Sequence, residues 1–183
     1  MVDVAIKSTD GHPLVYLPHH DYYSDALLRD VLSKVHSFAM VGASANWKRP
    51  SFYAMKYLLK KGYRVMPVNP SRAGTEFLGQ QVYANIADCP GTLDMVDVFR
   101  SSEAAYDVAK DTVANMVAKN IKVLWLQLTV RNDKAAELAE EAGLTVIMNR
   151  CPKIEFARRS GELGWSGINT KIVTAKVLRS PKI

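Results

Sequence analysis

The chain has 183 residues, of which 48% are hydrophobic and 23% charged, and its formal net charge at pH 7 is +6. This length suits one domain with a sizeable core, and the composition is that of an ordinary soluble globular protein. No apolar run approaches the length of a membrane span and no signal-peptide pattern opens the chain, so we expect a cytoplasmic protein without a membrane partner. Cys89 and Cys151 lack the spacing of a disulfide framework or a metal cluster.

The positive charge raises the hypothesis of a nucleic-acid-binding protein. Lys and Arg are spread along the chain and accompany no recognised nucleic-acid motif, which favours an ordinary solvated surface. An excess of basic over acidic residues also suits a small polyanionic ligand. We therefore expect a small-molecule partner and no nucleic acid.

Strands and helices alternate through residues 24–156, which we interpret as one domain between an N-terminal arm (1–23) and a C-terminal extension (157–183). The arm carries His12, His19 and His20, but no nearby ligand suggests a metal site, and we expect none. Apolar spacing and turn residues predict helices over 26–35, 51–61, 102–119 and 132–142, and strands over 37–41, 64–68, 95–99, 121–126 and 145–148. Tyr53 is expected on the buried face of the second helix.

The alternation predicts an α/β fold, a Rossmann-like doubly wound parallel sheet in a single domain. Counted in chain order, the five strands are expected in the order 3-2-1-4-5. Residues 76–90 are interpreted as a small excursion with a turn at Gly79. Ligands of such sheets bind beyond the carboxyl ends of the strands, here at the switch between the first and fourth strands.

The first strand ends at Gly42, small residues follow, and a helical pattern opens near Pro50 or Ser51. A strand, a tight turn and a helix N-terminus form an anion site, because the first N–H groups of the helix lack partners and carry its positive dipole end. Lys48 and Arg49 in the same loop supply charge. The stretch therefore predicts a phosphorylated nucleotide ligand.

The nucleotide is not obviously NAD. The G-x-G-x-x-G fingerprint is only partial, since Ser44 and Trp47 stand at its second and third glycine positions. The second strand ends in Val68-Asn69-Pro70 without the carboxylate that holds an NAD ribose, and Arg72 follows. A cation there favours a phosphorylated ribose, as in NADP or coenzyme A (CoA), and no Tyr-x-x-x-Lys pair supports hydride transfer.

The chain resembles the small bacterial CoA-binding proteins of the Rossmann type, which are related to the CoA-binding domain of the succinyl-CoA synthetase α subunit. The resemblance covers about residues 35–156. It rests on Val41-Gly42-Ala43-Ser44, Arg49-Pro50-Ser51, Gly62-Tyr63-Arg64-Val65-Met66-Pro67-Val68-Asn69-Pro70, Asp94-Met95-Val96-Asp97-Val98-Phe99-Arg100, Val123-Leu124-Trp125-Leu126-Gln127-Leu128 and Asn149-Arg150-Cys151-Pro152-Lys153. Thr129 departs from the family, which usually has Gly there, and is expected to alter the approach of a ligand.

The resemblance implies a site for CoA or an acyl-CoA at the strand ends. The loop backbone would face the diphosphate, cations would neutralise phosphates, the end of the second strand would line the adenosine, and the fourth strand would point toward the pantetheine arm. The residues so implied are Gly42, Ala43, Ser44, Lys48, Arg49, Ser51, Asn69, Pro70, Arg72, Phe99, Arg100 and Gln127.

We interpret the chain as a CoA-binding module without evident catalytic machinery, since it is too short for the synthetase's further domains. An NADP-dependent oxidoreductase is the alternative. Cys151 raises the hypothesis of a mixed disulfide with CoA, against the commoner buried structural thiol. Asp94 and Asp97 are three apart on a strand and point to opposite faces, so we do not expect an acid–base pair. A homodimer is suggested only by the extra terminal segments.

Overall fold

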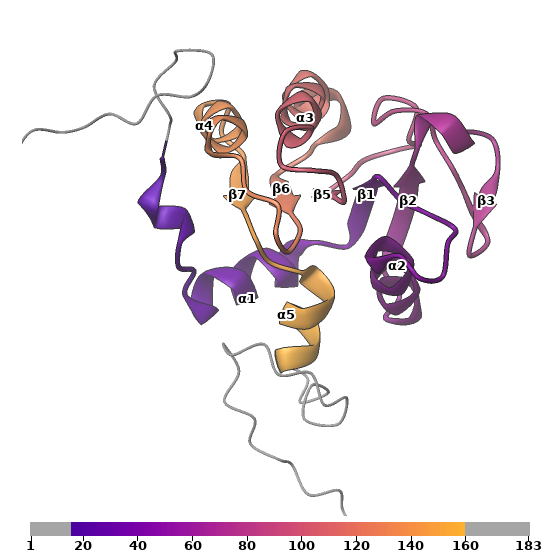
Figure 1. Ribbon diagram of the computed structural model, residues 1–183, viewed down its shortest axis with the longest axis horizontal. Coiled ribbons are helices and arrows are strands. Elements are labelled where there is room, and N and C mark those ends of the chain that lie inside the picture. The colour runs from indigo at the N-terminus through magenta and orange to yellow at the C-terminus, as the bar shows by residue number, and fades with distance from the viewer. Residues whose placement is uncertain (1–15, 160–183) are drawn as a thin grey trace, which may run out of the picture.

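The fold is a five-stranded parallel sheet covered by helices on both faces (Figure 1). The computed structural model describes residues 16–159. The strands are β1 (Ser37–Val41), β2 (Arg64–Val68), β5 (Met95–Val98), β6 (Val123–Leu126) and β7 (Thr145–Ile147). Helices α3 (Ala105–Lys119) and α4 (Asp133–Glu141) cover one face, and α1 (Asp25–Lys34), α2 (Pro50–Lys60) and α5 (Pro152–Arg159) cover the other. The predicted Rossmann-like doubly wound sheet is confirmed.

Two apolar cores lie on the two faces of the sheet, because successive strand residues point to opposite sides. The core under α3 and α4 takes one set of strand residues, including Ala39, Val96, Leu124 and Val146. The core under α1 and α2 takes the alternate set, including Phe38, Met40, Met95, Trp125 and Ile147. The strand residues are mostly apolar, as expected for strands covered on both faces, and Asp97 of β5 is a buried charged exception.

The predicted strand order was wrong. The sheet runs β2-β1-β5-β6-β7, which is 2-1-3-4-5 in the count of the five predicted strands. No crossover helix follows β2. The excursion (residues 76–90) instead pairs with the outer edge of β2, where Tyr83 N–H donates to Pro67 O (2.9 Å) and Asn69 N–H donates to Tyr83 O (2.9 Å). With that edge filled, β5 pairs with the free edge of β1. The switch point therefore lies between β1 and β5.

The excursion itself contains a two-residue hairpin between β3 (Glu76–Phe77) and β4 (Gln80–Gln81). Leu78 and Gly79 both have positive φ angles (50° and 74°), as a tight hairpin turn requires. Gly79 was the predicted turn residue. Because β2 is an edge strand, the missing N–H of Pro67 faces the excursion and interrupts no pairing with β1.

Most predicted helix boundaries agree with the structure to within a few residues, and capping side chains explain two of the helix starts. Ser24 accepts a hydrogen bond from Leu27 N–H and caps α1, and Asn132 does the same for α4 through Ala135 N–H. The helix α5 was not predicted, and most of the expected C-terminal extension lies outside the described residues, as do residues 1–15 of the N-terminal arm. The described part of the arm forms the short 3-10 helix η1 (Pro18–His20).

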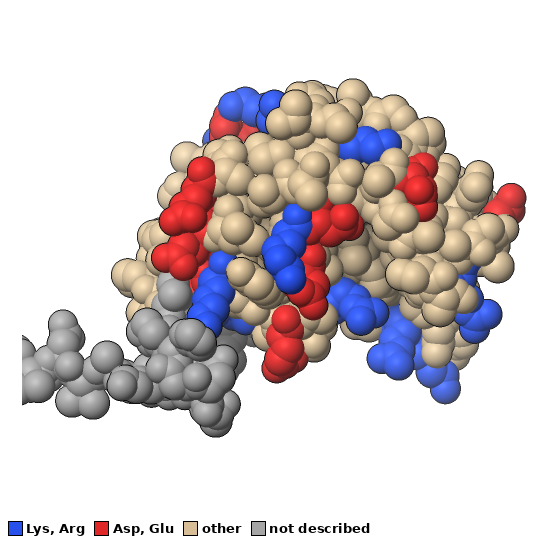
Figure 2. All heavy atoms as spheres, turned by 90° about the horizontal axis from the view of Figure 1, so that it is seen from above, with Lys and Arg blue, Asp and Glu red and all other residues tan. Residues whose placement is uncertain are grey.

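Charged side chains of both signs are scattered over the face shown in Figure 2. Lys and Arg side chains occur there in separate small groups, with large uncharged areas between them. Within residues 16–159, no helix is both long enough and apolar enough to cross a membrane.

Candidate functional site

The loop between β1 and α2 forms one wall of the candidate site. Gly42 begins this loop with a φ of +85°, and a Cβ atom there would lie 2.4 Å from the carbonyl oxygen of Phe99 at the end of β5. Two atoms cannot approach so closely, so only glycine fits where the chain leaving β1 passes the end of β5. The side chain of Arg100 also lies across this glycine, since its Cδ would be 2.9 Å from the same Cβ.

Hydrogen bonds from side chains hold the loop in place. Asn69, just after β2, donates its amide to Ala43 O (2.8 Å) and accepts from the backbone N–H of Ser71 (3.1 Å). Within the loop, Ser44 Oγ accepts from Asn46 N–H and the Asn46 carboxamide accepts from Lys48 N–H. The loop is therefore tied to the end of β2 and braced by hydrogen bonds of its own side chains.

The helix α2 presents its N-terminus to the same space. Its N-cap residue is Arg49, which makes no side-chain capping bond, and Pro50 occupies the first turn. Pro50 has no N–H and the Phe52 N–H donates to Arg49 O (3.0 Å), so of the first N–H groups that of Ser51 is left for another acceptor at the positive end of the helix dipole. Ser51 lies buried in this first turn.

A cavity of about 890 Å³ lies where these elements meet, at the carboxyl ends of β1, β5 and β6. Its volume is within the range typical of small-molecule sites. It is lined by Gly42, Ala43, Ser44, Lys48, Arg49, Pro50, Ser51, Tyr53, Ala54, Asn69, Phe99, Arg100, Gln127, Leu128, Thr129, Val130, Cys151, Lys153 and Ile154.

The structure brings together all of the candidate residues except Pro70 and Arg72, which do not line the cavity. The sequence also missed part of the wall, namely the apolar residues Leu128, Val130 and Ile154. Tyr53 was expected to be buried, but its side chain is 45% exposed and faces the cavity. Apolar wall residues carry the same sequence signal as core residues, which is why periodicity placed Tyr53 on a buried face.

The cavity lining is strongly positive. Its four cations are Lys48, Arg49, Arg100 and Lys153, and none of the lining residues within 16–159 is acidic. Arg100 is close in sequence to Asp97 and Glu103, but no ion pair links it to either carboxylate among the described residues. The positive charge is therefore available to a ligand.

A buried carboxyl group lies beneath the cavity. Asp97 is fully buried on β5 and is paired in register with Met40 of β1 and Trp125 of β6. Gln127 in the cavity wall donates to its Oδ1 (2.7 Å), while Oδ2 has no partner in the described part of the chain. Burial raises the pKa of Asp97 to about 7, against the smaller lowering effect of the Gln127 hydrogen bond.

Cys151 reaches the cavity from the loop after β7 as a buried free thiol. Burial raises the pKa of this thiol to about 11, so it is protonated at neutral pH. A protonated thiol is a poor nucleophile, and this weakens the hypothesis of thiol exchange with CoA.

Thr129 adopts a left-handed backbone conformation with a φ of +68°. This conformation is costly for a β-branched residue and easy for glycine, which explains why glycine suits the position. The side chain of Asn149, itself at a φ of +53°, stabilises the turn by accepting from Thr129 N–H (2.8 Å).

The fold and the site together define a Rossmann-like α/β protein with a basic cavity at its topological switch point. Residues 36–157 match the family model described as a CoA binding domain, and the chain belongs to this family. It is similar to the uncharacterized protein YneT of Bacillus subtilis, with 32% identity over 134 residues that span 73% of this chain and 95% of YneT.

Several solved structures share this fold. A hypothetical protein from Pyrococcus horikoshii is 35% identical with a TM-score of 0.69, covering 75% of this chain and 93% of its own. The cell-free ID.343 protein from Thermus thermophilus is 34% identical with a TM-score of 0.68, covering 74% and 98%. A dinucleotide-forming acetyl-coenzyme A synthetase from Ca. Korarchaeum cryptofilum, at 22% identity and a TM-score of 0.53, shares the fold over 62% of this chain and 26% of its own.

Proposed function

We propose that this protein binds CoA or an acyl-CoA in the cavity between the ends of β1 and β5. The observation that carries the proposal is the joining of a glycine turn, an uncapped helix N-terminus and four cations around one space without a lining carboxylate. A diphosphate fits such a site because it accepts hydrogen bonds from backbone N–H groups and needs its charge neutralised. Membership of the CoA-binding family selects CoA among the nucleotides with a diphosphate.

We infer an orientation for the ligand from the lining residues and the family resemblance. The diphosphate would lie against Gly42, Ala43 and Ser44 at the start of α2, with the adenosine toward Asn69. Arg72 ends the short 3-10 helix η2 (Pro70–Arg72) that follows Asn69, and its side chain is exposed. Although it does not line the cavity, we assign it to the ribose phosphate, which would project from the adenosine toward solvent. The pantetheine arm would pass Gln127 toward Cys151.

The role we propose is binding or delivery of the ligand rather than covalent chemistry. Of the lining residues, Cys151 is the natural nucleophile to consider, and the raised pKa of its thiol keeps it protonated. Asp97 does not line the cavity, and its Oδ1 accepts a hydrogen bond from the side-chain amide of Gln127, which does. Neither group is presented to a bound thioester in a reactive form.

Titration calorimetry with CoA, dephospho-CoA, NADP and NAD in parallel tests the proposal. We expect CoA to bind, and its affinity to fall at least about tenfold, or 1.4 kcal/mol, without the 3′-phosphate. Binding of NADP with no heat from CoA would overturn the proposal. It would instead favour the oxidoreductase alternative.

Charge-removing variants test the location of the site. Arg49→Met and Arg100→Met should each weaken CoA binding, because each removes a cation from the cavity wall. Arg29→Met is the matched control, since Arg29 is an exposed cation on α1 outside the cavity. Equal affinities for the three variants would place the ligand elsewhere. Arg72→Met should weaken CoA binding but leave dephospho-CoA binding unchanged.

A further inference from the structure

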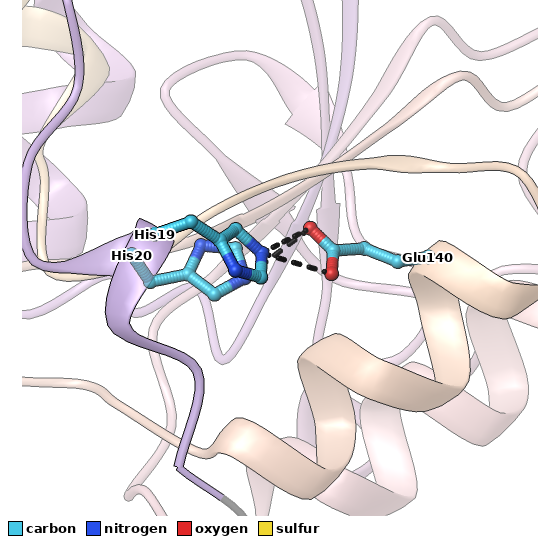
Figure 3. Close-up of side chains that lie close together, drawn as sticks. All are labelled: His19, His20 and Glu140. Atoms are coloured by element: carbon cyan, nitrogen blue, oxygen red, sulfur yellow. Dashed lines mark hydrogen bonds and ion pairs between the residues drawn. The ribbon is translucent and has the colours of Figure 1, made fainter.

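Two histidines of the N-terminal segment meet a glutamate of α4, and none of the three residues lines the cavity. His19 Nε2 lies 3.2 Å and 3.1 Å from the two carboxylate oxygens of Glu140, and His20 Nε2 lies 3.2 Å from one of them (Figure 3). The two imidazole rings are adjacent, with centroids 4.1 Å apart. One ligand atom from each residue lies within 4.8 Å of those of the other two.

His20 is buried and held in position by its neighbours. Its side chain is 1% exposed, and within the described residues its Nε2 has no hydrogen-bond partner, since the approach to Glu140 lacks hydrogen-bond geometry. Its other ring nitrogen, Nδ1, is 2.7 Å from the hydroxyl of Tyr23, which in turn accepts from Met148 N–H (2.7 Å). A buried ring nitrogen without a hydrogen-bond partner lowers the stability of the fold, unless a ligand binds its lone pair or an acceptor binds its N–H.

This arrangement matches the requirements of a transition-metal site. A tetrahedral ion with bonds of about 2.0–2.2 Å has its ligand atoms about 3.3–3.6 Å apart. Each imidazole Nε2 lies 3.1–3.2 Å from a Glu140 oxygen, and the three ligand atoms all lie within 4.8 Å of one another. Metal-binding histidines commonly donate their second ring N–H to a fixed acceptor, and the Tyr23 hydroxyl lies where it can accept from Nδ1. Two imidazoles and one carboxylate suit zinc and its neighbours in the first transition row.

We propose that His19, His20 and Glu140 form a binding site for one divalent transition-metal ion of the zinc type. His19 is 56% exposed and Glu140 33% exposed, so the ion would lie at the surface and complete its coordination with water. The ion would join η1 to α4 across 120 residues of sequence and fix the N-terminal segment to the domain. None of the three residues lines the cavity, so this proposal and CoA binding fail or succeed separately.

Calorimetry and thermal unfolding of the full chain, freed of metal with a chelator, test the proposal with Zn²⁺ as the probe. We expect one equivalent of Zn²⁺ to bind and the unfolding temperature to rise with its concentration, because the ion binds the folded state. The absorption spectrum of bound Co²⁺ should report a tetrahedral site.

Variants of the two exposed ligands avoid disturbing the buried His20. His19→Gln and Glu140→Gln should each lower Zn²⁺ affinity at least about tenfold, since even an outer-shell partner of a metal site contributes that much. His36→Gln and Glu141→Gln are the matched controls, because both residues lie outside the cluster and Glu141 is the chain neighbour of Glu140. No stoichiometric binding, or the same affinity in all four variants, would overturn the proposal.

Discussion

The buried carboxyl group of Asp97 makes the strongest prediction for stability. The unfolded chain holds this group at a pKa of 3.8, whereas burial between Met40 and Trp125 raises the pKa in the folded protein to about 7. Between these values the folded state keeps a proton that the unfolded state has released. Raising the pH therefore favours unfolding, and the full cost of about 4 kcal/mol is present above pH 7.

Asp97→Asn removes this titration while keeping the size of the side chain and an oxygen that accepts from Gln127. From pH 5 to pH 8, wild type should lose about 2.5 kcal/mol of unfolding free energy relative to Asp97→Asn. Urea unfolding at several pH values measures this difference, and the shared titration of all other groups cancels. Parallel pH profiles for the two proteins would refute the raised pKa.

Asp94 provides a control of opposite sign only three residues away. Burial opposes its ionisation, but hydrogen bonds from the His36 and Ser37 backbone and from the Ser37 hydroxyl outweigh burial and lower its pKa. Its stabilising effect is therefore complete above pH 3.8 and is lost only as the pH falls through the lowered pKa. Asp94→Asn should destabilise by a constant amount from pH 5 to pH 8, and a pH-dependent loss would contradict this assignment.

Three further substitutions test other features. Thr129→Gly should raise the unfolding free energy by about 1 kcal/mol in urea by relieving the positive φ, whereas Thr129→Ala should not. Gly42→Ala should lower both the unfolding temperature and CoA affinity, because its Cβ would meet Phe99 O; unchanged values would refute the close contact. Trp125→Phe should cost about 1–3 kcal/mol in urea unfolding, since Arg150 O loses the indole N–H donor (2.7 Å) and a void remains; a neutral effect would show that the site relaxes.

The layers of the fold could be predicted because their signals are local. Short apolar runs and helical apolar spacing located the strands and most helices, and the capping side chains of Ser24 and Asn132 marked two helix starts. The strand order could not be predicted in this way. It depends on which segment fills the outer edge of β2, and that is decided by hydrogen bonds from Tyr83, which no local pattern encodes.

The helix α5 was missed because Pro152 looks like an interruption, although proline is favoured in the first turn of a helix. What stabilises α5 is distant in sequence, such as the contact of Phe156 with the ring of Tyr63 (centroids 4.9 Å apart). Part of the candidate site could be predicted from the sequence, because its loop carries a glycine turn and cations. The pairing of Glu140 with His19 could not be predicted from the sequence, because the two residues lie 121 positions apart.

The excursion that fills the edge of β2 also guards the sheet against other chains. An open strand edge offers its backbone groups to any extended segment and invites aggregation. Here the edge of β2 is occupied by Tyr83 and includes a proline, and beyond the short β7 the N–H of Met148 is taken by the Tyr23 hydroxyl. Removing the part of the excursion that carries Tyr83 would thus threaten the colloidal stability of the protein more than its ligand affinity.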